Sequence, residues 1–275
     1  MNYQITQLHV YPIKSLGGIA LSKATLSPRG ILHDRRWMLT TPNGHFITQR
    51  THPTLAQFRL QFQPNGLLVQ HPNANTSILV PFELPPHRPI IDVIIFKDNC
   101  EATVAAEEIN EWFSRVIGEE VLLVYQHDQS IRPLKNHPGY EVSFSDGQQF
   151  LFIGEASLAQ LNTRFEAPFP MNRFRPNIVF SGGSPHVEDH WRHIKIQEAE
   201  LEYTKLCGRC KVVTIDQSTA IVGKEPLRTL ATYRTEGKKV FFGSQFKWLS
   251  STYNTIAVGD QIEVLSEILP TAPDQ

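Results

Sequence analysis

The sequence predicts an α+β protein that is mainly β, built from two β-barrel-like lobes with a few helices. Short apolar runs rich in Val, Ile, Phe and Thr alternate with turn signals along most of the chain. Two segments place apolar residues at helical spacing. The 275 residues, 41% of them hydrophobic, also exceed the usual size of one domain. We therefore expect one lobe over residues 1–98, a second over residues 99–270 and a frayed tail over residues 271–275.

The first lobe is expected to consist of strands joined by tight turns. Its apolar runs are ITQLHVYPI, RRWMLTTPNGHFITQR, FRLQFQPNGLLVQ, TSILVPFEL and IIDVIIF. PNGHF and QPNGLL contain the Asn-Gly pair that favours hairpin turns. A small barrel or a curled sheet would bury the apolar face of such strands.

Two helices and a second set of strands are expected to follow. The first helix runs from Glu101 to Gly118, near the seam between the lobes, and its apolar residues are Ala105, Ile109, Trp112, Phe113 and Val116. The second helix runs from Glu155 to Arg164 and carries Leu158 and Leu161 on one face. After Phe174 the expected strands are NIVFSGG, HIKIQEAELEY, KVVTID, KVFFGSQFKWL and TIAVGDQIEVLSEIL.

Composition narrows the class of partner. With 26 basic and 27 acidic residues the net charge is -1, which provides no general field for an extended nucleic acid. The N-terminus MNYQITQLHVYPIKS lacks the basic and apolar regions of a secretory signal, and no window is apolar enough to cross a bilayer. Three cysteines are too few for a disulfide framework. We expect a cytoplasmic protein with no nucleic acid and no membrane insertion.

Two of the three cysteines lie in KLCGRCKVVTID, and their spacing is compatible with four kinds of site. A structural zinc ion would need two further ligands, yet Cys100 is remote and the histidines of HVEDHWRH lie in what we expect to be a polar loop. A redox dithiol would open a helix, whereas KVVTID resembles a strand. Core packing is the ordinary fate of cysteine, but Gly208 and Arg209 suggest a tight turn with a cation. The fourth possibility is one thiolate that binds a metal held within an organic cofactor.

Anion-binding groups would have to accompany such a cofactor. In MNRFRPNIVFSGG, strand alternation would send Arg173, Arg175 and Asn177 to one face, where they could bind a phosphate, although a surface strand edge explains the pattern as well. YPIKS, with Lys14 and Ser15, and HDRRW, with Arg35 and Arg36, are the other basic clusters.

An Asp-Gly turn is a further candidate. Asp146, Gly147 and Gln148 in FSDGQQF form either an ordinary turn or a nest of backbone N–H groups near an anion or a metal. The common nucleotide, hydrolase and metalloprotease motifs are absent from the sequence.

Taken in order, these segments resemble the MOSC-domain proteins that carry a MOSC N-terminal β-barrel. The resemblance rests on YPIKS, HDRRW, FSDGQQFLFIGEASLAQLN, RFRPNIVFSG, CGRC with VVTID, KEPLRTL and VGDQIEVL, and it runs from about Tyr3 to Leu265. Within that family, the sequence is similar to the amidoxime-reducing branch. The fold implied is the MOSC β-barrel fold.

The resemblance implies a molybdenum cofactor, in which a pterin (molybdopterin) carries the metal and one protein cysteine binds it. That ligand would be Cys210, with Cys207 in a supporting role. Asp146 would lie near the metal and take part in catalysis. The remaining implied contacts to the cofactor are Lys14, Ser15, Arg35, Gly147, Gln148, Arg175, Asn177, Gly208 and Arg209. Gly147 and Gln148 replace small hydroxyl residues of the family, so the hydrogen bonding there is expected to differ.

The activity implied is reduction of a small N-hydroxylated substrate, with oxygen-atom abstraction at molybdenum. Some bacterial relatives carry a ferredoxin-type domain with four cysteines, whereas here no cysteine follows Cys210. We therefore expect electrons from a separate flavin, iron-sulfur or haem protein. The alternative is a module that carries molybdenum cofactor or sulfur to other enzymes.

Overall fold

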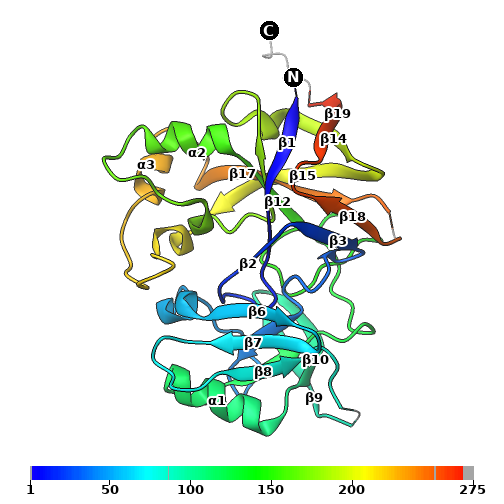
Figure 1. Ribbon diagram of the computed structural model, residues 1–275, viewed down its shortest axis with the longest axis vertical. Coiled ribbons are helices and arrows are strands. Elements are labelled where there is room, and N and C mark those ends of the chain that lie inside the picture. The colour runs from blue at the N-terminus through cyan, green and yellow to red at the C-terminus, as the bar shows by residue number, and fades with distance from the viewer. Residues whose placement is uncertain (1, 86, 251, 269–275) are drawn as a thin grey trace.

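The computed structural model describes residues 2–85, 87–250 and 252–268, and the expected tail 271–275 lies outside these residues. It confirms the mainly β fold class. Figure 1 shows a larger upper lobe that contains β1, β12, β14, β15 and β17, above a smaller lobe that contains β6 to β10 and α1. The described residues include three α-helices, and none of them is long and apolar enough to cross a bilayer.

A closed seven-stranded barrel forms the larger lobe. Its strands follow one another around the ring, and β12 pairs with both β13 and β17 to close it. In ring order they are β12 (Phe150–Gly154), β13 (Ile178–Ser181), β1 (Tyr3–Val10), β19 (Gln261–Glu267), β14 (Trp191–Ile196), β15 (Ala199–Arg209) and β17 (Lys239–Trp248). Two short strands extend this sheet, β2 (Ile19–Leu21) beside β1 and β16 (Thr235–Glu236) beside β17.

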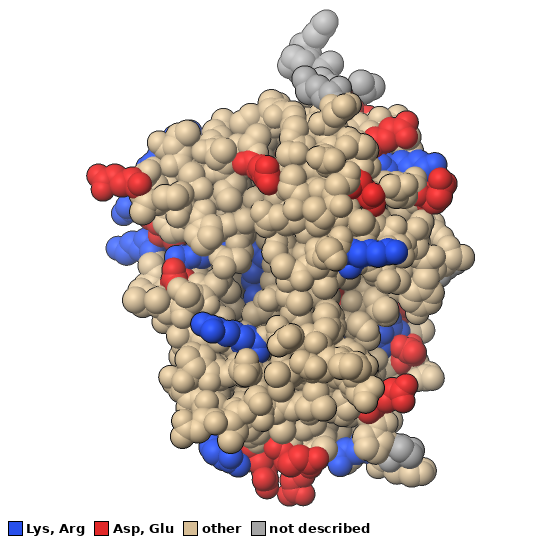
Figure 2. Space-filling model, viewed as in Figure 1, with Lys and Arg blue, Asp and Glu red and all other residues tan. Residues whose placement is uncertain are grey.

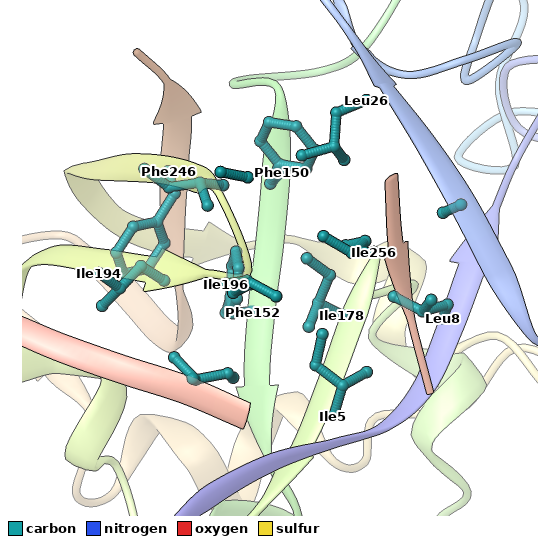
Figure 3. Packing of buried hydrophobic residues seen from close by; sticks show 14 of the residues in the cluster. Ile5, Leu8, Leu26, Phe150, Phe152, Ile178, Ile194, Ile196, Phe246 and Ile256 are labelled. Atoms are coloured by element: carbon teal, nitrogen blue, oxygen red, sulfur yellow. The ribbon is translucent and has the colours of Figure 1, made fainter. Parts of the chain in front are cut away.

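The barrel is filled by apolar side chains that alternate inward along its strands. Figure 3 shows side chains from β1, β12, β13, β14 and β17 pointing toward one another, among them Ile5, Phe152, Ile178, Ile194 and Phe246. All five are at most 1% exposed. A small sheet of β18 (Asn254–Ala257), β3 (Lys23–Ser27) and β4 (Gly30–Ile31) contributes Leu26 and Ile256 to the same core.

Two sheets and one helix form the smaller lobe. The first sheet runs β5 (Trp37–Thr40), β11 (Leu122–Tyr125), β10 (Asp98–Val104) and β9 (Ile90–Ile95), and the second runs β6 (Arg59–Gln63), β7 (Gly66–Gln70) and β8 (Ile78–Pro81). The QPNGLL hairpin is confirmed, because Gln63 pairs with Gly66 across its turn. Helix α1 (Glu107–Ile117) packs Ile109, Trp112 and Phe113 into the core of this lobe.

Helix α1 begins later than the sequence predicted. Residues 101–104 continue strand β10, where they pair with β9 and β11. The helix predicted from Glu101 is therefore too long at its start. Gly118 ends the helix as expected, with a φ of 87° that favours glycine. The second predicted helix is confirmed as α2 (Glu155–Asn162), and a short helix α3 (Leu227–Ala231) was not predicted.

Two other expectations about local structure were wrong. KVVTID is not a strand, because Lys211–Thr214 form a 3-10 helix directly after Cys210. HVEDHWRH is not a polar loop throughout, because Val187–His190 form a 3-10 helix and Trp191 begins β14. Glu188 and Trp191 are both fully buried. The conformation of both segments depends on packing against the barrel, which the local sequence pattern does not indicate.

The two lobes share the N-terminal part of the chain. Strand β1 pairs with β13 and β19 of the barrel, and β3 pairs with β18 near the C-terminus. Ile13 and Leu16, which follow β1, are buried in the core of the smaller lobe. The chain therefore crosses between the lobes just after β1, while the division into domains at residues 98 and 99 stays a prediction.

Candidate active site

One cavity of about 750 Å³ collects side chains from both lobes. All eleven residues that the family resemblance implied line it: Lys14, Ser15, Arg35, Asp146, Gly147, Gln148, Arg175, Asn177, Gly208, Arg209 and Cys210. Arg36 of the HDRRW cluster does not, and it pairs with Asp128 instead. They come from the crossing segment after β1, the turn between β4 and β5, the loop before β12, the approach to β13 and the end of β15. Lys14 and Cys210, which are 196 positions apart in the sequence, therefore line the same cavity.

The cavity wall is strongly cationic although the whole chain is nearly neutral. Nine of its residues are lysine or arginine and two are acidic, Asp146 and Glu236. The cations are Lys14, Arg35, Arg50, Arg173, Arg175, Lys205, Arg209, Lys238 and Lys239. Figure 2 shows blue Lys and Arg atoms in and around a recess left of the centre, at the level where the lobes of Figure 1 meet. Such a concentration of one charge in a concave site favours an anionic ligand.

Two arginines are held against one aromatic ring. The guanidinium carbons of Arg35 and Arg175 lie 4.3 Å and 4.2 Å from the centre of the Tyr11 ring. Both arginines have positive φ, 49° and 54°, a strained conformation that turns their side chains out of the regular chain path. Burial lowers the pKa of Arg175 to about 10, and it raises the pKa of Tyr11 to about 12. The stacked guanidinium groups provide planar donors for an anion.

Asn177 is fixed by three hydrogen bonds. Its Oδ1 accepts from the backbone N–H of Leu151 at 3.2 Å and from Arg35 Nη1 at 3.3 Å, while its Nδ2 donates to the carbonyl of His9 at 3.3 Å. The predicted strand alternation of Arg173, Arg175 and Asn177 was wrong, because β13 begins only at Ile178. A 3-10 turn over Met171–Arg173 and the positive φ of Arg175 bring these side chains to the cavity instead.

Lys14 and Asp146 form an ion pair in the cavity wall. Lys14 Nζ also donates to the carbonyl of Phe144 at 2.6 Å, and the lysine is only 3% exposed. Burial lowers the pKa of Lys14 to about 8, although Asp146 favours its charged form. Asp146 lines the cavity, and its side chain is 59% exposed. Desolvation works to raise the pKa of its carboxyl, but Lys14 and nearby arginines bring the pKa below the ordinary value.

The two cysteines of CGRC have different surroundings. Cys207 is 7% exposed and packs in an apolar cluster with Leu151, Phe174 and Phe242, whereas Cys210 is exposed on the cavity wall. The predicted tight turn at Gly208 and Arg209 was wrong, because both residues continue strand β15 and pair with β17. Cys210, the first residue beyond the strand, is therefore exposed in the cavity, whereas Cys207, which also lines the cavity, is buried against the apolar cluster.

Arg209 connects the two cysteine environments. Its Nη1 donates to Cys207 Sγ at 3.0 Å, and its Nη2 donates to the carbonyl of Phe174 at 2.6 Å. The guanidinium lies 5.3 Å from the centre of the Phe174 ring. Its Nε is buried without a hydrogen-bond partner among the described residues.

Several other polar atoms of the cavity residues are also buried without a partner in the part of the chain that the structure describes: Ser145 Oγ, Gln148 Oε1 and Arg173 Nε. Gln148 is 6% exposed, so its amide oxygen is withdrawn from bulk water. Gly147 packs against the amide of Gln245, which would have to shift if a Cβ were added. Buried polar groups without partners are costly, so these atoms indicate a polar ligand.

Some cavity residues were not predicted from the sequence. Thr48, Gln49 and Arg50 lie in a loop of the smaller lobe that carries no motif, and Lys205, Lys238 and Lys239 lie on β15 and the β16–β17 hairpin. The adjacent lysines in EGKKV, at a turn signal, were the one available hint. Within the described ranges, no group of three or more His, Cys, Asp or Glu residues is arranged to hold a metal ion by itself. A metal at Cys210 would therefore depend on ligands from outside the protein.

Comparison with known proteins agrees with this architecture. Residues 2–120 match the MOSC N-terminal beta barrel domain, and residues 139–263 match the MOSC domain. The chain is 29% identical to mitochondrial amidoxime-reducing component 1 of Homo sapiens, over 96% of this chain and 83% of that protein. It is 32% identical to mitochondrial amidoxime reducing component 2 of Rattus norvegicus, over 84% of this chain and 72% of that protein.

A longer relative shares the same region. The chain is 30% identical to molybdenum cofactor sulfurase of Arabidopsis thaliana, over 90% of this chain but 33% of that protein. The two domain matches agree with the two lobes of the structure, and the alignments cover the segments that line the cavity. The chain belongs to the MOSC family, in the group that joins a MOSC N-terminal beta barrel domain to a MOSC domain and includes the mitochondrial amidoxime-reducing components.

Proposed function

We propose that this protein is a molybdenum-cofactor-dependent oxidoreductase that reduces N-hydroxylated compounds. The observation that carries the proposal is one exposed thiol, Cys210, in a cavity whose wall has nine cations and two acids. The net reaction would convert an N-hydroxylated compound, two electrons and two protons to the reduced compound and water. The names of the amidoxime-reducing relatives support this choice of substrate class.

The residues of the cavity fit the anionic, heteroaromatic cofactor that the family implies. Lys14, Arg35 and Arg175 would hold its phosphate, and the fixed amide of Asn177 would help orient the donors of Arg35. Gln148 Oε1 and Arg209 Nε, which lack partners among the described residues, would receive hydrogen-bond partners from the pterin. Cys210 would supply the single protein sulfur, since soft thiolates suit such metals.

When bound, the cofactor would supply a metal that exchanges oxygen and electrons with the substrate. The protein would contribute placement, charge and a proton. Below about pH 8 Lys14 carries a proton next to the Asp146 carboxylate. Lys14 would transfer this proton to the carboxylate oxygen of Asp146 that it contacts, and the Asp146 carboxyl would donate it to the substrate oxygen, as general acid catalysis requires a donor within hydrogen-bond reach.

Electrons would come from a separate protein. The 275 residues contain three cysteines, one fewer than the four thiolates that a usual iron-sulfur cluster requires. A flavin, iron-sulfur or haem protein would serve as the donor. Turnover of purified protein with NADH alone would contradict this part of the proposal.

The decisive experiment combines metal analysis with turnover. Protein made in a host that synthesises molybdenum cofactor is assayed for molybdenum and for oxidised pterin fluorescence, and then for benzamidoxime reduction with a chemical electron donor. We expect retained molybdenum and turnover, both lost in Cys210→Ala and both kept in Cys100→Ala, which is the matched control outside the cavity. Turnover that survives Cys210→Ala would refute the assigned ligand.

A carrier of molybdenum cofactor or sulfur is the second candidate. The exposure of Cys210 favours it, because an accessible thiol can hold sulfur or release a bound group, and the sulfurase relative supports it. Molybdenum that exchanges readily with an acceptor protein, without turnover of benzamidoxime, would identify the carrier.

A further inference from the structure

Three lysines border the cavity beside Cys210, and we call Lys205, Lys238 and Lys239 the mouth lysines. Lys205 lies on β15, Lys238 in the turn between β16 and β17, and Lys239 at the start of β17. All three line the cavity and are exposed. Among the residues that the structure describes, none of their ammonium groups makes an ion pair or a hydrogen bond within the protein.

The mouth lysines differ in this respect from two other lysines on the barrel strands. Lys195 pairs with Glu198 at 3.3 Å, and Lys247 pairs with Glu202 at 2.6 Å. In contrast, Lys205 has a pKa below its ordinary value because of burial, and Lys239 adds to the shift by repelling its charge. Glu236 faces Lys239 across the hairpin but forms no ion pair with a mouth lysine among the described residues. An anion placed between Lys205 and Lys239 would relieve their repulsion.

Strand register brings the mouth lysines beside the thiol. Gly208 pairs with Phe241 and Arg209 pairs with Val240, so Cys210 and Lys239 are the next residues along the two strands. The stem of Lys239 passes over Gly208, where its Cδ lies 4.0 Å from the position a Cβ would take. Lys239 can therefore reach the part of the cavity that Cys210 faces.

The mouth lysines lie on other elements than the cations assigned to the cofactor phosphate. The phosphate of the proposed cofactor would be held by Lys14, Arg35 and Arg175, which come from the crossing segment, the β4–β5 turn and the approach to β13. The mouth lysines come from β15 and the β16–β17 hairpin, and no ion pair joins them to a carboxylate in the ranges that the structure describes. A dianionic phosphate matches three positive charges better than a single carboxylate does.

We propose that the mouth lysines bind a phosphate group of the substrate, so that the natural substrate is a phosphorylated N-hydroxylated compound. This inference rests on the proposed function. The N-hydroxyl group would face Cys210 while the phosphate contacts Lys239 and its two neighbours. Lysine is well suited to this role because its ammonium acts as a point charge toward phosphate. A docking surface for an acidic electron donor is the competing use of the same charges.

The test compares an N-hydroxylated cytidine with its 5′-monophosphate, using a chemical electron donor so that no protein docks. We expect a higher kcat/KM for the phosphorylated compound. Lys238→Ala and Lys239→Ala should each lower that value about tenfold, the equivalent of one charge-assisted contact, through KM and with little change in kcat. Lys224→Ala is the matched control, an exposed lysine outside the cavity wall. A carboxylated analogue should gain less than the monophosphate.

A binding measurement separates failure of this inference from failure of the proposed function. Calorimetry with cytidine and cytidine 5′-monophosphate requires no turnover, and we expect tighter binding of the monophosphate that is lost in Lys238→Ala and Lys239→Ala. Equal binding of the two ligands would overturn the inference even if benzamidoxime is reduced. Effects of the lysine variants that appear only with a protein electron donor would overturn it as well, in favour of docking. Phosphate-dependent binding without any turnover would support the anion site and reject the reductase.

Discussion

Gln49 of the smaller lobe and Gln217 of the larger lobe exchange hydrogen bonds through their side-chain amides. Gln49 Nε2 donates to Gln217 Oε1 at 3.2 Å, and Gln217 Nε2 donates to Gln49 Oε1 at 3.1 Å. Gln49 Nε2 also donates to the carbonyl of Ser15 at 2.7 Å, and the residue is 1% exposed. This pair ties the loop before Arg50 to the segment that follows Cys210, so it holds the two walls of the cavity together.

Breaking this pair should destabilise the protein and loosen the site. Gln49→Ala leaves the Ser15 carbonyl and the Gln217 Oε1 atom without their donor, while Gln217 Nε2 keeps its hydrogen bond to the carbonyl of Ile215. We expect a loss of about 1–3 kcal/mol in the free energy of unfolding. Urea unfolding of Gln49→Ala, Gln217→Ala and the double variant measures the coupling between the two residues. The control is Gln57→Ala, which removes a more exposed bond to the carbonyl of Ser218 and should cost less. Strictly additive effects of the first two changes would contradict the proposed bridge.

The two cysteines of CGRC should respond differently to substitution. Cys207→Ala removes a buried sulfur and the acceptor for Arg209 Nη1, so it should lower the free energy of unfolding by about 1 kcal/mol. Cys210→Ala changes an exposed side chain and should leave stability within about 0.5 kcal/mol while molybdenum retention is lost. Thermal unfolding and metal analysis on the same samples check both. Equal loss of metal in the two variants would indicate a shared dithiol or zinc site.

Anion binding at the buried cations should weaken as pH rises through about 8, because Lys14 loses its proton in that range while Arg175, with a pKa of about 10, stays charged. Below that pH the Lys14 ammonium is charged and attracts the anion. Sulfate is a suitable probe because its own charge is constant between about pH 6 and 9, and its binding to cofactor-free protein is followed by calorimetry. Lys14→Met should bind sulfate weakly with a flat pH profile. A wild-type profile as flat as that of the variant would contradict the assignment.

Glu188 should make stability depend on pH. Burial raises the pKa of this carboxyl to about 7, although it accepts hydrogen bonds from Gly154 N and Ser157 Oγ at the start of α2. The folded state therefore binds more protons than the unfolded chain between the ordinary value of 4.5 and about 7. The stabilisation is complete below this window and is lost as pH rises through 7, by roughly 3 kcal/mol at most.

Glu188→Gln tests this relationship because glutamine is neutral at every pH and keeps an acceptor oxygen. Urea unfolding is compared at about pH 5.5 and about pH 8. Relative to wild type, the variant should gain stability at the higher pH. An unchanged difference between the two proteins at both values would show that Glu188 is not protonated in the folded state.

Local patterns in the sequence were sufficient for the mainly β class, the Gln63–Gly66 hairpin, the end of α1 at Gly118 and the position of α2. These features depend on neighbours in the chain, through turn chemistry and the spacing of apolar residues. The ordered motifs also identified eleven residues that line one cavity, among them Lys14, Asp146 and Cys210. The roles of those residues stay predictions.

Tertiary structure decided how those residues reach the cavity. Arg175 arrives through a positive φ before β13, and Cys207 and Cys210 diverge because β15 continues through Arg209. The Gln49–Gln217 pair and the mouth lysines carry no motif, since each depends on a contact between segments that are distant in the sequence. Sequence by itself determined which chemical groups are present and where local elements form. Packing of the two lobes, which depends on contacts far apart along the chain, decided which groups face one another and which stay without a partner.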